Sequence, residues 1–188
     1  MIKYLIDQFE ISEKEAELLT SCFRVKVFVK GHRFLKAGEV SHRIGFIDSG
    51  LVKCVLIKES KEMVDDFVFE NQFIANYHSF LTRTASTKEL VCMKQSQIRV
   101  ADRAQLEALG EKHPFMERVA RLIAEGLFIA THQKLENIRL LTAEERYLKL
   151  FHSNKKLLQD IPQYEIASYL NVSPETVSRI RNTLKNRS

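Results

Sequence analysis

The feature that most constrains the fold is a short turn between two amphipathic segments near the C-terminus, Asn171-Val172-Ser173. Asparagine tolerates the left-handed backbone conformation that such a sharp turn requires. Ser173 can cap a following helix through its hydroxyl group, and Pro174 suits the first helical position, where a missing N–H is harmless. The sequence therefore predicts two helices joined by a short turn, which is a helix-turn-helix arrangement.

Each of the two predicted helices has one apolar and one polar face. The apolar positions are Ile166, Ala167 and Leu170 on the first helix and Val177, Ile180 and Leu184 on the second. On the second helix, Glu175, Ser178, Arg179 and Asn182 are spaced i, i+3, i+4 and i+7, so they share the other face. In the major groove of DNA an arginine can pair with guanine O6 and N7, and a glutamate can accept a hydrogen bond from cytosine N4.

The basic residues around this face favour DNA as a partner. Arg181, Lys185 and Arg187 flank the face and suit phosphate contacts, and a formal net charge of +5 favours a polyanionic partner. The alternative is a plain helical hairpin with solvated charges, because acid–base pairs at i, i+4 are common. The predicted DNA-binding residues are Gln163, Ser173, Glu175, Thr176, Ser178, Arg179, Arg181 and Lys185.

Short apolar segments between glycines indicate an antiparallel β domain over residues 24 to 101. Strands at this spacing are typical of a sandwich, jelly roll or barrel. Within the domain, residues 70–83 are predicted to be a loop with a short helix, and residues 1 to 22 are predicted to be helical, with a capping box at Ser12 and Glu15. The predicted strands are Arg24–Val29, Arg43–Ile47, Leu51–Lys58, Met63–Phe69, Leu90–Met93 and Gln97–Ala101.

A long segment from Pro114 to Leu141 has a dense helical pattern with two adjacent apolar stripes. Two stripes make a face too wide for docking on one domain alone, so we expect this helix also to pack against a second copy of the chain across a two-fold axis. The alternative is a helix buried entirely within its own chain. The predicted dimer interface is the first stripe, Phe115, Val119, Leu122, Gly126 and Ile129; the second stripe is Met116, Ala120, Ile123, Leu127 and Ala130.

The remaining C-terminal residues are predicted to form a small helical domain that opens with a capping box at Thr142 and Glu145. No flexible linker separates it from the long helix. The predicted organisation is a β domain over residues 1–113, a dimerisation helix over 114–140 and a helix-turn-helix domain over 141–188.

In this arrangement and in its motif the chain resembles the Crp/Fnr family of bacterial transcription regulators over essentially its whole length. The segment Glu175-Thr176-Val177-Ser178-Arg179 is similar to the family's E-T-x-S-R recognition helix. The resemblance implies an α+β fold with an N-terminal β roll, a long dimerisation helix and a C-terminal winged helix-turn-helix. It also implies that Glu175, Ser178 and Arg179 read a TTGA-like half-site. Pro174 replaces an arginine of the catabolite-activator branch, so that branch's additional contact is lost.

The resemblance also implies a β roll that binds cyclic nucleotides in other members of the family. Their phosphate cassette pairs a Gly-Glu with a later Arg-Ser, since a cyclic phosphate needs a guanidinium and a hydroxyl while a carboxylate holds the ribose. Alignment places Ala75-Asn76 and Ser86-Thr87 at these two pairs, and Arg83 lies three residues early. We therefore predict that cyclic AMP does not bind tightly. The candidate effector-pocket residues are Asn76, Tyr77, Arg83, Ser86 and Thr87.

Other chemistries have little support in the sequence. The three cysteines, Cys22, Cys54 and Cys92, are widely spaced among apolar neighbours, which favours core positions over a disulfide, a zinc site or a redox sensor. The N-terminal segment offers only Cys22, which excludes the four-cysteine iron–sulfur cluster of the oxygen-sensing branch. The scattered histidines indicate neither haem nor a cupin metal site. We expect no enzyme activity, no cofactor and no metal.

The expected function is that of a homodimeric, cytoplasmic regulator that binds double-stranded DNA at a palindrome, with half-sites about one helical turn apart. No segment suits a membrane span or a signal peptide. RNA polymerase is a candidate partner, and no small-molecule effector is identified. The alternatives are a regulator or sensor module whose roll binds a cyclic nucleotide or another effector, and an interaction module that does not contact DNA.

Overall fold

The structure is a computed structural model that describes residues 1–59, 61–153 and 160–186. The chain divides into two compact units, Met1–Ala124 and Glu125–Ser188. The division falls inside the long helix α5 (Phe115–Leu140), so this helix contributes to both units. The predicted limits of 113 and 140 treat the helix as a separate part, whereas here its two halves belong to different units.

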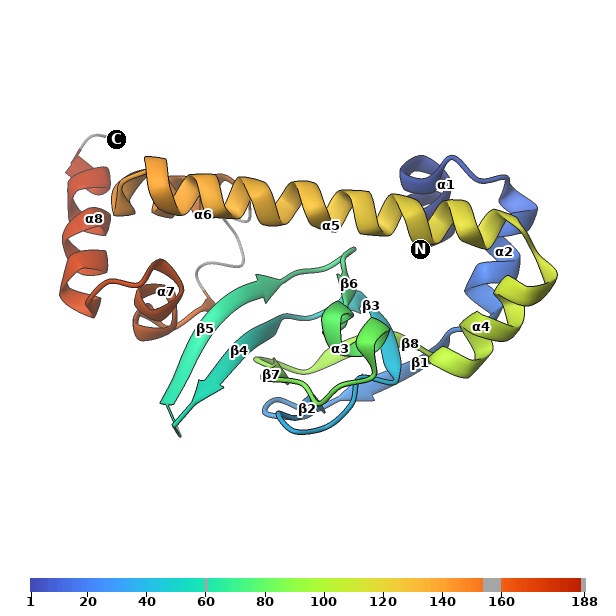
Figure 1. Cartoon of the computed structure of the whole chain (residues 1–188). Helices are drawn as coiled ribbons and strands as arrows, with labels where there is room; N and C mark the ends of the chain where they lie inside the picture. The colour runs from blue at the N-terminus through green and yellow to red at the C-terminus, as the bar shows by residue number, and fades with distance from the viewer. Residues whose placement is uncertain (60, 154–159, 187–188) are drawn as a thin grey trace. The chain divides into compact units, whose positions relative to one another are not determined.

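Two four-stranded sheets, both antiparallel, form the β part of the first unit. One has the order β1-β8-β3-β6 and the other β2-β7-β4-β5. Large apolar side chains fill the space between them, among them Ile47, Ile98, Ile74 and Leu90. The strands are β1 (Arg24–Phe28), β2 (Arg33–Leu35), β3 (Arg43–Ser49), β4 (Val52–Lys58), β5 (Lys61–Val68), β6 (Phe73–Ile74), β7 (Lys88–Cys92) and β8 (Ser96–Asp102). Figure 1 shows β4 and β5 as a long hairpin.

Six of these strands were expected from the sequence, and β2 and β6 were not. The two unexpected strands have three and two residues, too few to show an alternation of apolar and polar side chains. Helix α3 (Tyr77–Thr82) confirms the predicted short helix between β6 and β7. Helix α4 (Arg103–Lys112) was also not expected; none of its residues is fully buried, and Leu106 and Leu109 pack against the core only in part.

Helices cover one end of the first sheet. Helices α1 (Ile2–Phe9) and α2 (Glu13–Ser21) replace the continuous helical segment, because Glu10 adopts a left-handed conformation with φ 50°. The predicted capping box is confirmed: the backbone N–H of Ser12 donates to Glu15 Oε2 at 2.7 Å. These helices pack with α4 and the first half of α5 around Leu5, Phe9 and Val119.

The second unit contains the rest of α5 followed by α6 (Ala143–Ser153), α7 (Gln163–Leu170) and α8 (Pro174–Asn186). The capping box at the start of α6 is confirmed, since the backbone N–H of Thr142 donates to Glu145 Oε2 at 2.7 Å. Apolar side chains from all three helices are buried here, including Tyr147, Ile166 and Val177. Among residues 141–153 and 160–186 the structure contains no strand, so the predicted wing is not found there; residues 154–159 lie outside the described part.

Candidate nucleic-acid interface

The turn between α7 and α8 has the geometry that its residues predict. Asn171 adopts the left-handed conformation, with φ 54° and ψ 48°. The backbone N–H of Val172 donates to Ala167 O at 3.0 Å, which closes the end of α7. The backbone N–H of Thr176 donates to Ser173 Oγ at 3.3 Å, and α8 begins at Pro174. The predicted cap, turn and helix start are therefore confirmed.

The buried face of α8 fixes which of its residues point outward. Val177 is fully buried and Ile180 nearly so, and Leu184 is half-buried. On the opposite side Glu175 and Arg179 are exposed and Ser178 is half-exposed. The Arg179 guanidinium donates to Thr176 Oγ1 at 3.2 Å. We call the group Glu175, Thr176, Ser178 and Arg179, of which Thr176 and Ser178 are half-exposed, the reading face.

The carboxylate of the reading face is held in its ionised form. A hydrogen bond from the Ser173 side chain lowers the pKa of Glu175, and its own backbone N–H and the nearby Arg179 act in the same direction. An ionised carboxylate only accepts hydrogen bonds. Glu175 is therefore prepared as an acceptor, beside an arginine that only donates.

The side chains of two predicted DNA-contact residues, Gln163 and Arg181, bond to a neighbouring helix. The Gln163 amide donates to Pro174 O at 2.6 Å and so connects the starts of α7 and α8. The Arg181 guanidinium donates to Tyr147 Oη at 3.1 Å and lies over the same ring. In these positions both side chains hold helices together. Arg181 uses its Nε for this bond, and the phosphate contact predicted for it stays a prediction. The side chain of Lys185 lies outside the described part of the chain.

The long helix uses its apolar residues differently along its length. Val119 is buried within its own chain, where Phe115 and Leu122 pack around the same cluster. This placement leaves the first half of the predicted interface stripe little surface for a second chain. Gly126 and Ile129, the other predicted interface residues, are exposed.

A different stripe is exposed on the second half of α5. Its members recur at alternating steps of four and three residues, the spacing that places side chains along one seam of a helix. Phe128 is 65% exposed, Leu135 47% and Ile138 57%. We call this group the α5 seam; it consists of Ala124, Phe128, Thr131, Leu135 and Ile138. The same spacing can be found in the sequence, but the two adjacent apolar stripes that begin in the first half of the helix led to a different choice of interface residues.

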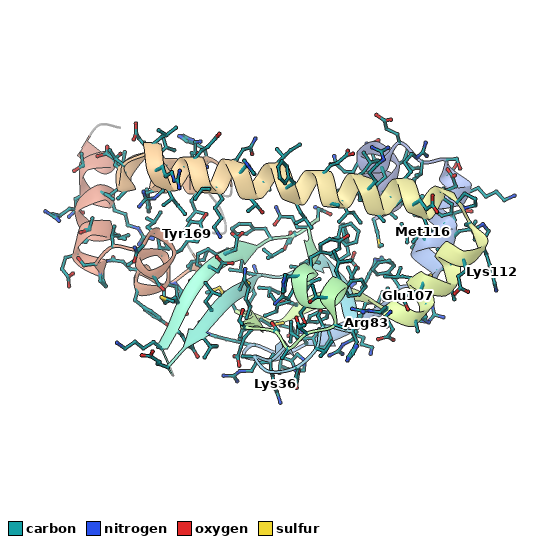
Figure 2. All side chains as sticks on the ribbon, in the orientation of Figure 1. Lys36, Arg83, Glu107, Lys112, Met116 and Tyr169 are labelled. Carbon is teal, nitrogen blue, oxygen red and sulfur yellow. The ribbon has the colours of Figure 1, made fainter. Side chains whose placement is uncertain are left out.

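The candidate effector residues largely satisfy one another. The Asn76 amide donates to Ser86 Oγ at 2.7 Å, and both residues are buried. Asn76 Oδ1 also caps α3 by accepting from the backbone N–H of Ser79. Arg83 points instead toward α4, where it donates to Glu107 at 3.4 Å (Figure 2).

The last two candidate effector residues lie outside this buried group. Thr87 is exposed, and Tyr77 stacks on Phe80 with ring centroids 6.3 Å apart. Of the five predicted pocket residues, the structure joins Asn76 and Ser86 by a hydrogen bond. Asn76 and Ser86 form a structural contact, and the guanidinium expected for a phosphate is directed elsewhere.

The cysteines occupy core positions, in agreement with the interpretation from the sequence. Cys22, Cys54 and Cys92 are buried and not joined by disulfides. Burial raises the pKa of the Cys22 and Cys92 thiols, which keeps these groups protonated and unreactive. Within the described residues, no three His, Cys, Asp or Glu side chains are grouped so as to hold a metal ion.

None of the described helices combines the length and the apolar character needed to cross a membrane.

Comparison of the sequence with models of protein families and with curated proteins gives no match. The fold, in contrast, is shared with several solved structures. The c-di-GMP-responsive global regulator CLP of Xanthomonas campestris is 15% identical, with a TM-score of 0.70 over 94% of this chain and 93% of CLP. FixK2 of Bradyrhizobium japonicum is 16% identical, with a TM-score of 0.75 over 88% of this chain and 85% of FixK2.

A third structure carries the name of the family that the motif resembles. A putative transcriptional regulator of the Crp/Fnr family from Eubacterium rectale is 12% identical, with a TM-score of 0.70 over 98% of this chain and 88% of that protein. The chain therefore has the fold of Crp/Fnr regulators over nearly its full length.

Proposed function

We propose that the chain is a sequence-specific DNA-binding transcription regulator of the Crp/Fnr family that acts as a homodimer. The observation that carries the proposal is the reading face of α8. A turn with a left-handed Asn171 and a Ser173 cap sets the start of the helix, and its buried side leaves Glu175 and Arg179 exposed next to each other. A compact pair of one acceptor and one forked donor suits the edges of neighbouring base pairs.

The pair of side chains favours a particular half-site. Arg179 would donate to guanine O6 and N7, and Glu175 would accept from a cytosine N4 on the complementary strand. A TTGA-like half-site contains such a guanine and its paired cytosine. Ser178 and Thr176 complete the contact surface, and Gln163 supports it from α7 through its bond to Pro174 O.

A palindrome has two half-sites and is read by two copies of the reading face, so the proposal requires a dimer. We place the dimer contact on the α5 seam. Burying a Phe, Leu or Ile side chain contributes roughly 1.5–3 kcal/mol, and the two-fold axis uses each seam residue twice. Gly126 and Ile129 are exposed but lie toward the other side of the helix, since two residues turn an α-helix by about 200°, so this proposal replaces them with the seam residues. Val119 belongs to the core of its own chain and is not included.

The function is tested by selecting binding sites from a random duplex DNA pool with the protein purified without additives. The salt concentration is kept at about 100 mM so that non-specific phosphate contacts do not dominate. Selection of a palindrome with TTGA-like half-sites supports dimeric DNA reading. Binding without sequence preference, also after addition of cell extract to supply an effector, would contradict the proposal.

As such a regulator the protein would act in the cytoplasm, with RNA polymerase as a further candidate partner. We also propose that neither cyclic AMP nor cyclic GMP regulates this chain. Asn76 and Ser86 already use each other as partners, and Arg83 is directed at Glu107.

Titration calorimetry with cyclic AMP and cyclic GMP is therefore expected to show no binding in the micromolar range. A cyclic phosphate would have to break the bond between Asn76 and Ser86 and recruit a guanidinium from outside. Micromolar binding of either nucleotide would overturn this expectation and favour a sensor role for the β roll.

The contact from Glu175 is expected to be insensitive to pH between about 8 and about 5.5. The pKa of Glu175 is lowered in the folded chain, so its ionised contribution is complete above the ordinary glutamate pKa of about 4.3 and is lost only when the pH falls through the lowered pKa. The measurement is the affinity ratio between the selected site and a site changed at the paired cytosine. A ratio that falls between pH 8 and 5.5 would show that another group controls this contact.

A further inference from the structure

Arg146, in the first turn of α6, connects the end of the long helix to the end of α7. Its Nη1 donates to Leu141 O and its Nη2 donates to Leu170 O, both at 2.9 Å. The first carbonyl follows directly after α5, and the second belongs to the last residue of α7. One rigid planar group thus joins two segments that lie far apart in the sequence.

The carbonyl groups at the end of a helix have no partner within that helix. A guanidinium satisfies two of them at once, and because its donors form a fixed fork, it also fixes the distance and direction between them. Hydrogen bonds from a charged donor are stronger than those between neutral groups. Arg146 is half-buried, which reduces the competition from water.

The hydrogen bond from Arg146 to Leu170 O affects the direction of α8 because of where Leu170 lies in the chain. Leu170 is followed directly by Asn171, whose left-handed conformation redirects the chain into the recognition helix. A second polar contact supports the corner between α5 and α6, where Lys149 Nζ donates to Asn137 Oδ1 at 2.7 Å. A third joins α6 to α8 through Tyr147 and Arg181.

We propose that Arg146 is a positioning residue that transmits the direction of the dimer helix to the recognition helix, and so sets the half-site spacing that the dimer accepts. The inference rests on the proposed function. Arg146 does not contact DNA in this role. It affects the distance and orientation between the two reading faces of the dimer. The recognition of a single half-site is unchanged.

The first test measures binding to operators whose half-sites are separated by a series of spacer lengths, and to a single half-site. The wild type is expected to prefer one spacing. Arg146→Met removes both hydrogen bonds from a charged donor and is expected to lower that preference at least tenfold. Single half-site binding should be unchanged. Arg146→Lys, which can serve only one of the two carbonyls, should lie between the two, and Lys36→Met is the matched control for the loss of an exposed charge.

The second test needs no DNA. Spin labels at Glu136→Cys and Asn182→Cys, both exposed positions, report the distance between α5 and α8 when labelled chains are diluted with unlabelled ones; the three native cysteines are buried. Adding Arg146→Met, or the milder Arg146→Lys if the first variant fails to fold, is expected to broaden the distance distribution. An unchanged distribution together with an unchanged spacing preference would overturn the proposal. If the wild type shows no sequence preference at all, the regulator proposal fails, and the spin-label result still decides the role of Arg146.

Discussion

Arg179→Ala is expected to reduce the discrimination between the selected site and a site changed at the guanine by about 1–3 kcal/mol, or roughly 5- to 150-fold in relative affinity. The Arg179 side chain is exposed on the reading face, and its guanidinium lies within reach of Thr176 without being buried. The fold should be unaffected, since Val177 and Ile180 carry the packing of α8. The measurement is the affinity for both sites by fluorescence anisotropy.

The matched control is Arg181→Ala, which removes the same charge from the same helix. Arg181 bonds to Tyr147, so this change is expected to lower the melting temperature and to leave the base preference intact. A side chain that contacts only phosphate would behave differently, because its loss weakens binding to all sequences equally and reduces the salt dependence by about one charge. If Arg179→Ala behaves in that way, Arg179 is not a base-reading residue.

Leu135→Glu is expected to convert the dimer into a monomer at micromolar concentration. It removes an apolar side chain from the α5 seam and places like charges near each other across the two-fold axis. With two copies affected, the loss is roughly 3–6 kcal/mol of dimer stability, or more than about a hundredfold in the dissociation constant. Binding to the palindrome should fall to the level of a single half-site. Analytical ultracentrifugation and the operator titration measure the two effects.

Two further variants make this test specific. Gln133→Glu introduces the same charge on the opposite side of the helix, since two residues turn an α-helix by about 200°, and it should leave the dimer intact. Ile129→Glu examines the stripe expected from the sequence. If Ile129→Glu separates the chains and Leu135→Glu does not, the contact follows that stripe and the α5 seam is not the interface.

The local features of this protein could be predicted from its sequence because they depend on neighbouring residues. Asn171, Ser173 and Pro174 determine the turn and the start of α8 through their own backbone preferences and one side-chain cap. The capping boxes of α2 and α6 are equally local, each within four consecutive residues. Helical spacing then placed Glu175 and Arg179 on the exposed face.

What the sequence could not determine depended on residues distant in the chain. The docking of Val119 among α1, α2 and α4 was decided by side chains more than a hundred residues away, such as Leu5, and this docking moved the exposed stripe to Phe128, Leu135 and Ile138. The same holds for the hydrogen bonds from Gln163, Arg181 and Arg146 to other helices. In one and the same sequence context, a long polar side chain can reach solvent, DNA or a neighbouring carbonyl group. Only the packing of the helices determines which of these partners it contacts.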